Sequence, residues 1–325
     1  LNTKPPLINA KQKLFSAIGT IGLFAIALAL FNTFEYKSIY LSISILLITV
    51  GIIGYSIAEY SNKEAGIKNN GVWFSSISSR GLLAWISGIL LTLFYIALYW
   101  YPEYLGLGNG EEANTGLVAL FDPFSLFLKN EKASQWFVYG TFYTLAILLF
   151  GIKFIIKYRH NRYQVIRTIS VIFFQTAFAF IIPEIMLRLN QPYMDLKNVW
   201  PLNYYFFFDW NLTNMISSGS FGLFMLVWGI ALIFIVTPTL TYFYGKRWYC
   251  SWVCGCGGLA ETAGDPFRHL SDKSLNAWNF ERYIIHGVLL FVTVMTLGVL
   301  YNFFSNCTMA NFWIFPIIYL IISST

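Results

Sequence analysis

Long apolar segments dominate the pattern of the chain. Apolar runs of about 18 residues or more recur along it, and each could cross a hydrocarbon layer of about 30 Å as a helix. Pro183 and Pro238 lie inside two of these runs, where neighbouring helices or a local kink can re-satisfy the backbone groups that proline disturbs. We therefore predict an all-α fold, a polytopic bundle of about seven to eight transmembrane helices, with spans at Leu14–Phe31, Ile39–Ala58, Leu82–Tyr101, Trp136–Ile156, Ile166–Leu187, Phe221–Tyr242, Tyr283–Phe304 and, shorter, Asn311–Ile322.

The composition agrees with this pattern. Of 325 residues, 57% are hydrophobic and 11% are charged, which is too little polar surface for a water-soluble globule of this size. We predict a single transmembrane helical domain over residues 1–325, with the lipid bilayer as its solvent. The chain begins with Leu1 and stops directly after an apolar run, so we expect one or both ends of the natural protein to lie outside this sequence.

The basic residues indicate an orientation. Most of the 21 Lys and Arg residues fall in segments that share one side of the membrane, and this side is cytoplasmic by the positive-inside rule. The N-terminus is then cytoplasmic, and the protein is placed in a bacterial cytoplasmic (inner) membrane. The same topology gives an outer loop at 102–135, an outer aromatic loop at 188–220 and a cytoplasmic cysteine loop at 243–282. The net charge of +6 follows from topology and does not indicate a nucleic-acid partner.

Two outer segments are apolar without spanning. Gly116–Leu128 is too short to cross and is broken by Asp122 and the proline after it, so we predict an interfacial segment. Val199–Trp210 is rich in aromatic residues, as in the belts that lie at headgroup level. It either anchors the protein or forms a lid over a quinone or partner site.

The cysteines are the residues of this sequence that indicate a metal site. Three of the four lie close together as a C-x3-C-x-C array, formed by Cys250, Cys254 and Cys256. Thiolates bind soft metals, and the glycines between and after them allow the backbone to fold tightly around one centre. Lys246 and Arg247 precede the array and would offset the negative charge of thiolates and of a reduced cluster, which raises its reduction potential.

Other interpretations of the cysteine array stay open. A disulfide is disfavoured on a reducing cytoplasmic face, and inert buried thiols do not cluster for packing reasons. Zinc requires a fourth ligand, for which His269 and His286 lie on the same predicted face, and copper or a redox-active dithiol would also suit the thiols. No two of the three histidines project from the middle of spans, so a membrane haem is not favoured. We favour an iron–sulfur centre.

The fourth ligand of such a centre is not obvious. Cys307 follows the span Tyr283–Phe304, which places it at the opposite membrane face. The remaining candidates are His269, Asp265, another subunit or residues beyond Thr325. We therefore predict metal ligation by Cys250, Cys254 and Cys256, with His269 as an additional candidate.

The segment Tyr244–Gly258 resembles the membrane portion of polyferredoxin-type electron-transfer proteins typified by NosR, NapH and CcoG. Their signature, G-[KR]-R-x-[WY]-C-x-x-x-C-P-x-G, follows a transmembrane helix, and here Gly255 replaces the proline while Cys256 is an addition. The run CSWVCGCGGLAETAGDPFRHLSDKS, with PYMDLKNVWPLNYYFF upstream, resembles a subgroup described only as 4Fe-4S-binding membrane proteins. Family members add a second C-x3-C-P element and C-terminal ferredoxin motifs, which this sequence lacks.

The resemblance implies electron transport across or along the membrane. Together with the cysteine array it predicts an oxidoreductase component, an electron-transfer subunit holding a 4Fe-4S cluster at the cytoplasmic face. Its partners would be other membrane or redox subunits and a quinone. The alternatives are a structural or assembly subunit whose cysteine loop holds zinc or is empty, and a copper-handling protein. No catalytic triad, paired carboxylates or phosphate loop is found in the sequence.

Overall fold

The computed structural model describes residues 9–31, 35–61, 82–108, 112–191, 193–198, 200, 203, 205–245, 247–265, 272 and 274–305. These residues form helices and no strands, joined by turns and loops. They gather into two compact units. Unit 1 combines Leu1–Leu189 with Lys246–Leu270, and unit 2 combines Asn190–Gly245 with Ser271–Thr325. The single domain over residues 1–325 stays a prediction.

The helices of unit 1 are α1 (Ala10–Leu28), α2 (Lys37–Tyr60), α4 (Leu82–Trp100), η1 (Pro102–Leu105), α5 (Gly116–Leu120), α6 (Asp122–Lys129), α7 (Gln135–Lys157), α8 (Arg162–Phe173), η2 (Phe174–Ile181), α9 (Ile182–Arg188), α13 (Trp248–Trp252) and α14 (Gly255–Thr262). Those of unit 2 are α10 (Asp209–Ser217), α11 (Gly219–Ala231), η3 (Leu232–Val236), α12 (Thr237–Tyr244) and α15 (Leu275–Ser305).

Six of the helical segments are long and apolar enough to cross a membrane. They are Ala10–Leu28, Lys37–Tyr60, Gln135–Lys157, Arg162–Arg188, Gly219–Tyr244 and Leu275–Tyr301. Helix α4 adds a shorter apolar stretch, Gly88–Trp100, and the predicted short span Asn311–Ile322 lies outside the described residues. The predicted all-helical fold is confirmed, and the six candidate spans agree with a multi-pass membrane protein. The total of seven to eight spans and the cytoplasmic N-terminus stay predictions.

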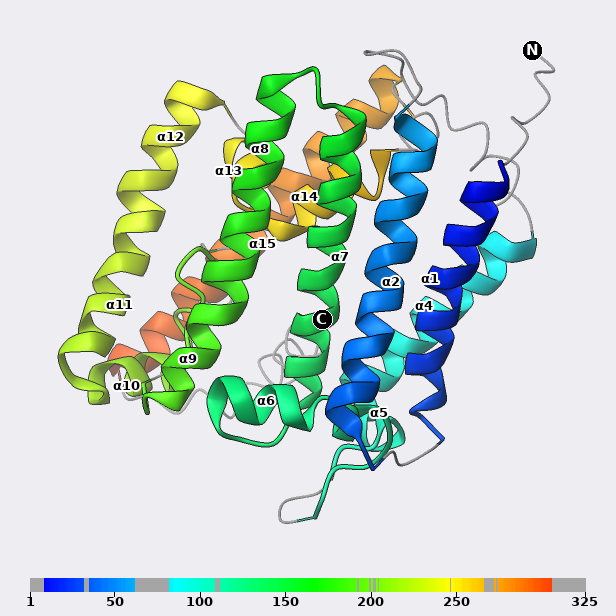
Figure 1. Cartoon of the computed structure of the whole chain (residues 1–325). Helices are drawn as coiled ribbons and strands as arrows, with labels where there is room; N and C mark the ends of the chain where they lie inside the picture. The colour runs from blue at the N-terminus through cyan, green and yellow to red at the C-terminus, as the bar shows by residue number, and fades with distance from the viewer. Residues whose placement is uncertain are drawn as a thin grey trace. The chain divides into compact units, whose positions relative to one another are not determined.

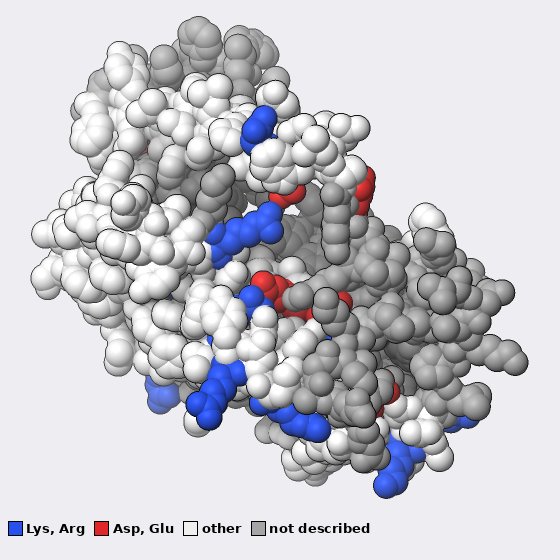
Figure 2. Space-filling view, turned by 90° about the horizontal axis from the view of Figure 1, so that it is seen from above, with Lys and Arg blue, Asp and Glu red and all other residues white. Residues whose placement is uncertain are grey.

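Helices α1, α2, α7 and α8 lie side by side in unit 1, with α2 and α7 running in one direction and α1 and α8 in the other (Figure 1). One end of this bundle, which we call the basic end, therefore collects the first residues of α1 and α8 and the last residues of α2 and α7. Figure 2 views the molecule from above, and its coloured charged side chains are mostly Lys and Arg with acidic ones beside them. The basic residues at this end of unit 1 include Lys11, Lys13, Lys157, Arg159, Arg162 and Arg167.

Aromatic pairs join α4 to the first half of α7. Ring centroids lie 4.9–6.2 Å apart in these pairs, all edge-to-face, a geometry worth about 0.5–1.5 kcal/mol per pair beyond area burial. The rings of Tyr139 and Tyr143, one turn apart on α7, are stacked with centroids 5.6 Å apart. The α4–α7 pairs are Phe94 with Phe142, Tyr95 with Tyr139, and Tyr99 with Trp136.

Pro183 and Pro238, the prolines of two described spans, each follow a π-helical turn. Pro183 in α9 follows η2, and Pro238 in α12 follows η3. Proline has no N–H and clashes with the carbonyl four residues earlier, and that carbonyl lies within the π segment in both cases. The wider turn thus supplies the local adjustment expected from the sequence. Beside Pro183, the buried Glu184 forms an ion pair with Lys129 of α6 at 3.7 Å.

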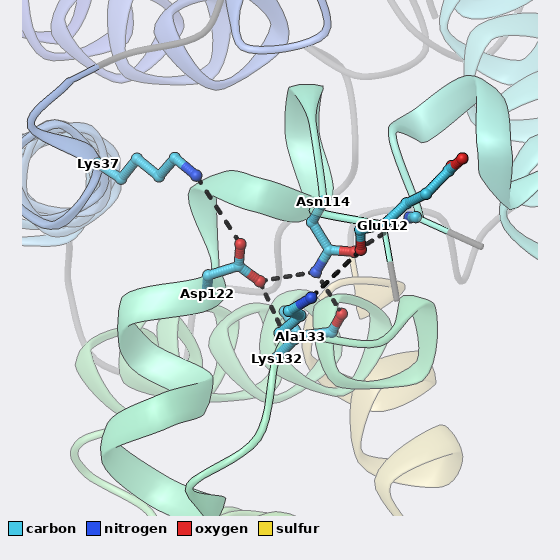
Figure 3. Close-up of polar contacts among 7 residues, drawn as sticks. Lys37, Glu112, Asn114, Asp122, Lys132 and Ala133 are labelled. Atoms are coloured by element: carbon cyan, nitrogen blue, oxygen red, sulfur yellow. Dashed lines mark hydrogen bonds and ion pairs between the residues drawn. The ribbon is translucent and has the colours of Figure 1, made fainter. Parts of the chain in front are cut away.

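The segment 116–128 divides at the predicted break into α5 and α6, and the side chains of α5 belong to the apolar core of unit 1. At the junction, Asp122 organises the surrounding loop (Figure 3). Its Oδ1 accepts hydrogen bonds from the Asn114 side chain (2.7 Å) and from the Ala133 backbone N–H (3.0 Å). Its Oδ2 lies 3.8 Å from Nζ of Lys37.

In unit 2, indole N–H groups tie the aromatic loop to the long helices. Trp200 donates to Oγ1 of Thr296 in α15 (3.1 Å), and Trp228 of α11 donates to the carbonyl oxygen of Leu196 (3.0 Å). Phe206 is buried within the unit. The described part of this loop is therefore held to helices of its own unit, and its role as a belt or a lid stays a prediction.

Replacing Asp122 by alanine should destabilise the protein, because the buried Asn114 side chain and the Ala133 N–H lose an acceptor. We expect a loss of about 1–3 kcal/mol in the free energy of unfolding, measured in detergent. The control is Lys37→Ala, which removes only the long, partly exposed ion pair and should cost under about 1 kcal/mol. Equal losses in the two variants would contradict this role for Asp122.

Candidate metal centre

The cysteine segment, residues 247–265, belongs to unit 1 and runs along α7 and α8 (Figure 1). Cys250 lies in α13, Cys254 is the N-cap residue of α14, and Cys256 lies in the first turn of α14. All three are free thiols. The array therefore forms two short helices joined at Cys254.

Two glycines permit the close packing of this segment. A Cβ at Gly257 would lie 2.0 Å from the carbonyl oxygen of Cys250, and a Cβ at Gly258 would lie 2.2 Å from Cγ1 of Val171 in α8. The first contact holds α13 against α14, and the second holds α14 against α8. Any side chain at either position would force the helices apart. The sequence CGCGG is thus a packing requirement as well as a candidate ligand array.

Polar contacts fix the segment to α8. The Ser170 hydroxyl donates to the carbonyl oxygen of Trp252 (2.8 Å). The guanidinium of Arg167 forms an ion pair with the carboxylate of Glu261, whose side chain is 30% exposed. One contact lies at the junction between α13 and α14 and the other near the end of α14, so both short helices are tied to α8.

A buried ion pair fixes the end of the segment to α7. Asp265 pairs with Lys157, and both side chains are nearly inaccessible to solvent. The Tyr158 hydroxyl donates to the second carboxylate oxygen at 3.0 Å. Since both oxygens of Asp265 are engaged, this contact does not favour Asp265 as the fourth metal ligand.

The cysteine segment extends from the basic end along α7. The Tyr143 hydroxyl of α7 donates to Sγ of Cys256 at 3.1 Å. Tyr143 precedes Lys157 by 14 residues, which is about 21 Å along an α-helix. The segment therefore reaches from Asp265 at the basic end to Cys256 at the depth of Tyr143. The predicted location of the array at the cytoplasmic face stays a prediction.

The three thiols differ in environment. Cys254 is buried, whereas Cys250 and Cys256 are exposed. The hydrogen bond with the Cys256 side chain raises the pKa of the Cys254 thiol, burial raises it further, and the backbone N–H groups of Gly257 and Cys256 oppose the change. Cys254 is thus a neutral thiol in the metal-free chain, and a metal that binds it must displace a proton.

The predicted ligands are brought together in part. The Cys254 and Cys256 side chains are hydrogen-bonded, and Cys250 contacts the same turn through its carbonyl group. Across the described ranges, no three Cys, His, Asp or Glu side chains are grouped closely enough to hold a metal ion. The donor set therefore fits an iron–sulfur cluster in kind, since it is a compact set of thiols, but it does not complete the four ligands.

Several predicted residues lie outside the described part of the chain. These are His269, the fourth-ligand candidate, Lys246, and Cys307. Arg247 is described and exposed, directly before α13. Its role in offsetting cluster charge stays a prediction.

Two residues near the cysteines were not predicted as site residues. Tyr143 is one of 21 tyrosines, and nothing in the sequence distinguishes it. Gln175 is buried in η2, where its amide donates to the Thr144 hydroxyl (3.3 Å) and its Oε1 faces the Gly255 backbone. The sequence feature that could have identified Gln175 is a polar residue within an apolar run.

Comparison with known proteins gives one match. A family model described as a 4Fe-4S binding domain matches residues 223–274, which include the cysteine array and much of the preceding span. Neither the curated proteins nor the solved structures gave a match. The matched region together with the apolar helices fits a membrane iron–sulfur protein. This supports the predicted type of cofactor, whereas the narrower resemblance to NosR and NapH stays a prediction.

Replacing Gly257 by alanine should separate α13 from α14 and expose Cys254. We expect a loss of about 1–3 kcal/mol in unfolding free energy, with faster maleimide labelling of Cys254 measured by peptide mass spectrometry. The control is Gly287→Ala in α15, where a Cβ meets no atom within 4 Å. Unchanged labelling of Cys254 in Gly257→Ala would show that the close contact is not required.

Replacing Asp265 by asparagine should remove the buried carboxylate that forms an ion pair with Lys157. We expect a loss of about 3–5 kcal/mol in unfolding free energy, and a partial recovery when Lys157→Met is added. Glu261→Gln, at the more exposed pair with Arg167, should cost less. A larger loss for Glu261→Gln than for Asp265→Asn would contradict this ranking of the two anchors.

Proposed function

We propose that this protein is a membrane electron-transfer subunit, and that Cys250, Cys254 and Cys256 ligate an iron–sulfur centre in it. The observation that carries the proposal is the position of three thiols within the region similar to a 4Fe-4S binding domain, packed against two helices of membrane-spanning length. The fourth ligand would come from His269 or from a neighbouring subunit.

When bound, a 4Fe-4S cluster supplies a one-electron couple. The chain contributes a rigid set of donors: Cys254 at the N-cap of α14, where the backbone N–H groups of Gly257 and Cys256 would stabilise a metal-bound thiolate, and Cys250 and Cys256 on either side of it in the sequence. Lys246 and Arg247 would offset the negative charge of this set. Fixed ligands favour electron transfer because little has to rearrange between oxidation states.

The surroundings of the array also suit this role. Ile147 of α7 and Val171 of α8 face the glycines of α14. The nearby acidic side chains of the described segment, Glu261 and Asp265, are paired with cations. No acid or base among them is left poised for hydrolytic chemistry. We place the basic end at the cytoplasmic side of a bacterial inner membrane, with a quinone, a flavin or another redox subunit as the electron partner.

The test is metal analysis and electron paramagnetic resonance on protein purified without oxygen. Wild type should contain iron and acid-labile sulfide and give a cluster signal on reduction, whereas Cys254→Ser and Cys256→Ser should lose both. Cys307→Ser, outside the predicted ligand set, is the matched control and should keep them.

Stoichiometric zinc or copper in place of iron would overturn the proposal. Zinc would support a structural or assembly subunit, and copper would support metal handling. The same purified sample therefore separates the three functions.

A further inference from the structure

A hydrogen bond links the cysteine array to the middle of a membrane-spanning helix. The Tyr143 hydroxyl lies 3.1 Å from Sγ of Cys256, although the two residues are 113 positions apart in the chain. A thiolate sulfur carries no hydrogen and can only accept. The hydroxyl therefore keeps its role as donor when Cys256 acts as a ligand.

The Tyr143 ring is held in position from two sides. It stacks on Tyr139 at an interplanar angle of 19°, and Cε1 lies 3.0 Å from where a Cβ of Gly255 would be. Helix α7 is itself fixed to the cysteine segment by the Lys157–Asp265 pair. The hydroxyl thus points at the sulfur because of the packing of α7 and α14, and not by chance rotation of a free side chain.

A donor at a ligand sulfur has a defined electronic effect. Reduction adds negative charge to a cluster and its thiolates, and a hydrogen bond to sulfur stabilises the more negative state. A hydrogen bond of this kind raises the reduction potential.

We propose that Tyr143 is a positioning residue that raises the reduction potential of the iron–sulfur centre by donating a hydrogen bond to Sγ of Cys256. This inference rests on the proposed function, since it requires a centre ligated by Cys256. It adds a residue of α7, well outside the matched region, to the electron-transfer site.

Tyr139 provides the matched control. It lies one turn away on the same helix, takes part in the same ring stack and also contacts α4, through the ring of Tyr95. Its hydroxyl interacts with Tyr95 and makes no hydrogen bond to a cysteine that the structure shows. Tyr139→Phe therefore changes the stack as Tyr143→Phe does, but leaves the donor at the sulfur intact.

The experiment is an anaerobic redox titration followed by electron paramagnetic resonance. Tyr143→Phe should retain wild-type iron content and shift the midpoint potential to more negative values, while Tyr139→Phe should stay at the wild-type potential. A wild-type midpoint in Tyr143→Phe, or an equal shift in Tyr139→Phe, would overturn the inference.

A second variant covers the case in which Tyr143→Phe does not fold. Site-specific 3-fluorotyrosine at position 143 keeps the ring and makes the hydroxyl a stronger donor, so the midpoint should move to more positive values. No shift, or a negative one, overturns the inference. Iron-free wild-type protein would instead overturn the proposed function, and with it this inference, so the two failures are distinguishable.

Discussion

The position of the thiols depends on how closely the backbone of α14 approaches its neighbours. Gly257 lies against the Cys250 carbonyl and Gly258 against Val171, at distances that leave no room for a Cβ. Without these contacts α13 and α14 could not share one layer with α8, and Cys250 would not reach the turn that carries Cys254 and Cys256. The arrangement of the three thiols thus depends on the missing side chains of these two glycines.

Two ion pairs then hold α13 and α14 against the apolar helices α7 and α8. An unpaired charge between apolar helices is costly, and Lys157 and Arg167 each meet an acidic residue of the cysteine segment. The basic residues that indicated orientation in the sequence therefore include two that also attach the segment to the bundle. The segment is attached near the basic end and extends inward from there.

The spans and the cysteine array could be predicted because each depends on local sequence. Apolar length decides whether a helix can cross a membrane, and the C-x3-C-x-C spacing is visible within a few residues. The hydrogen bond from Tyr143 to Cys256 and the burial of Asp265 could not be predicted, because both depend on which helix faces α14. The fourth ligand could not be predicted for the same reason. It is absent from the cysteine array, so only a tertiary contact could supply it.

The π turn of η2 has a consequence for two polar residues of the same span, Gln175 within it and Glu184 after it. Such a turn holds one residue more than the α-helical turn it replaces, which rotates the following face by about 100°. Gln175 can therefore face the α14 backbone while Glu184, within the same span, reaches Lys129 of α6. Deleting a single residue between Gln175 and Glu184 would restore a regular helix and turn one of the two side chains away from its neighbour. The number of residues in this stretch is therefore fixed by geometry, even where the side chains face only apolar surroundings.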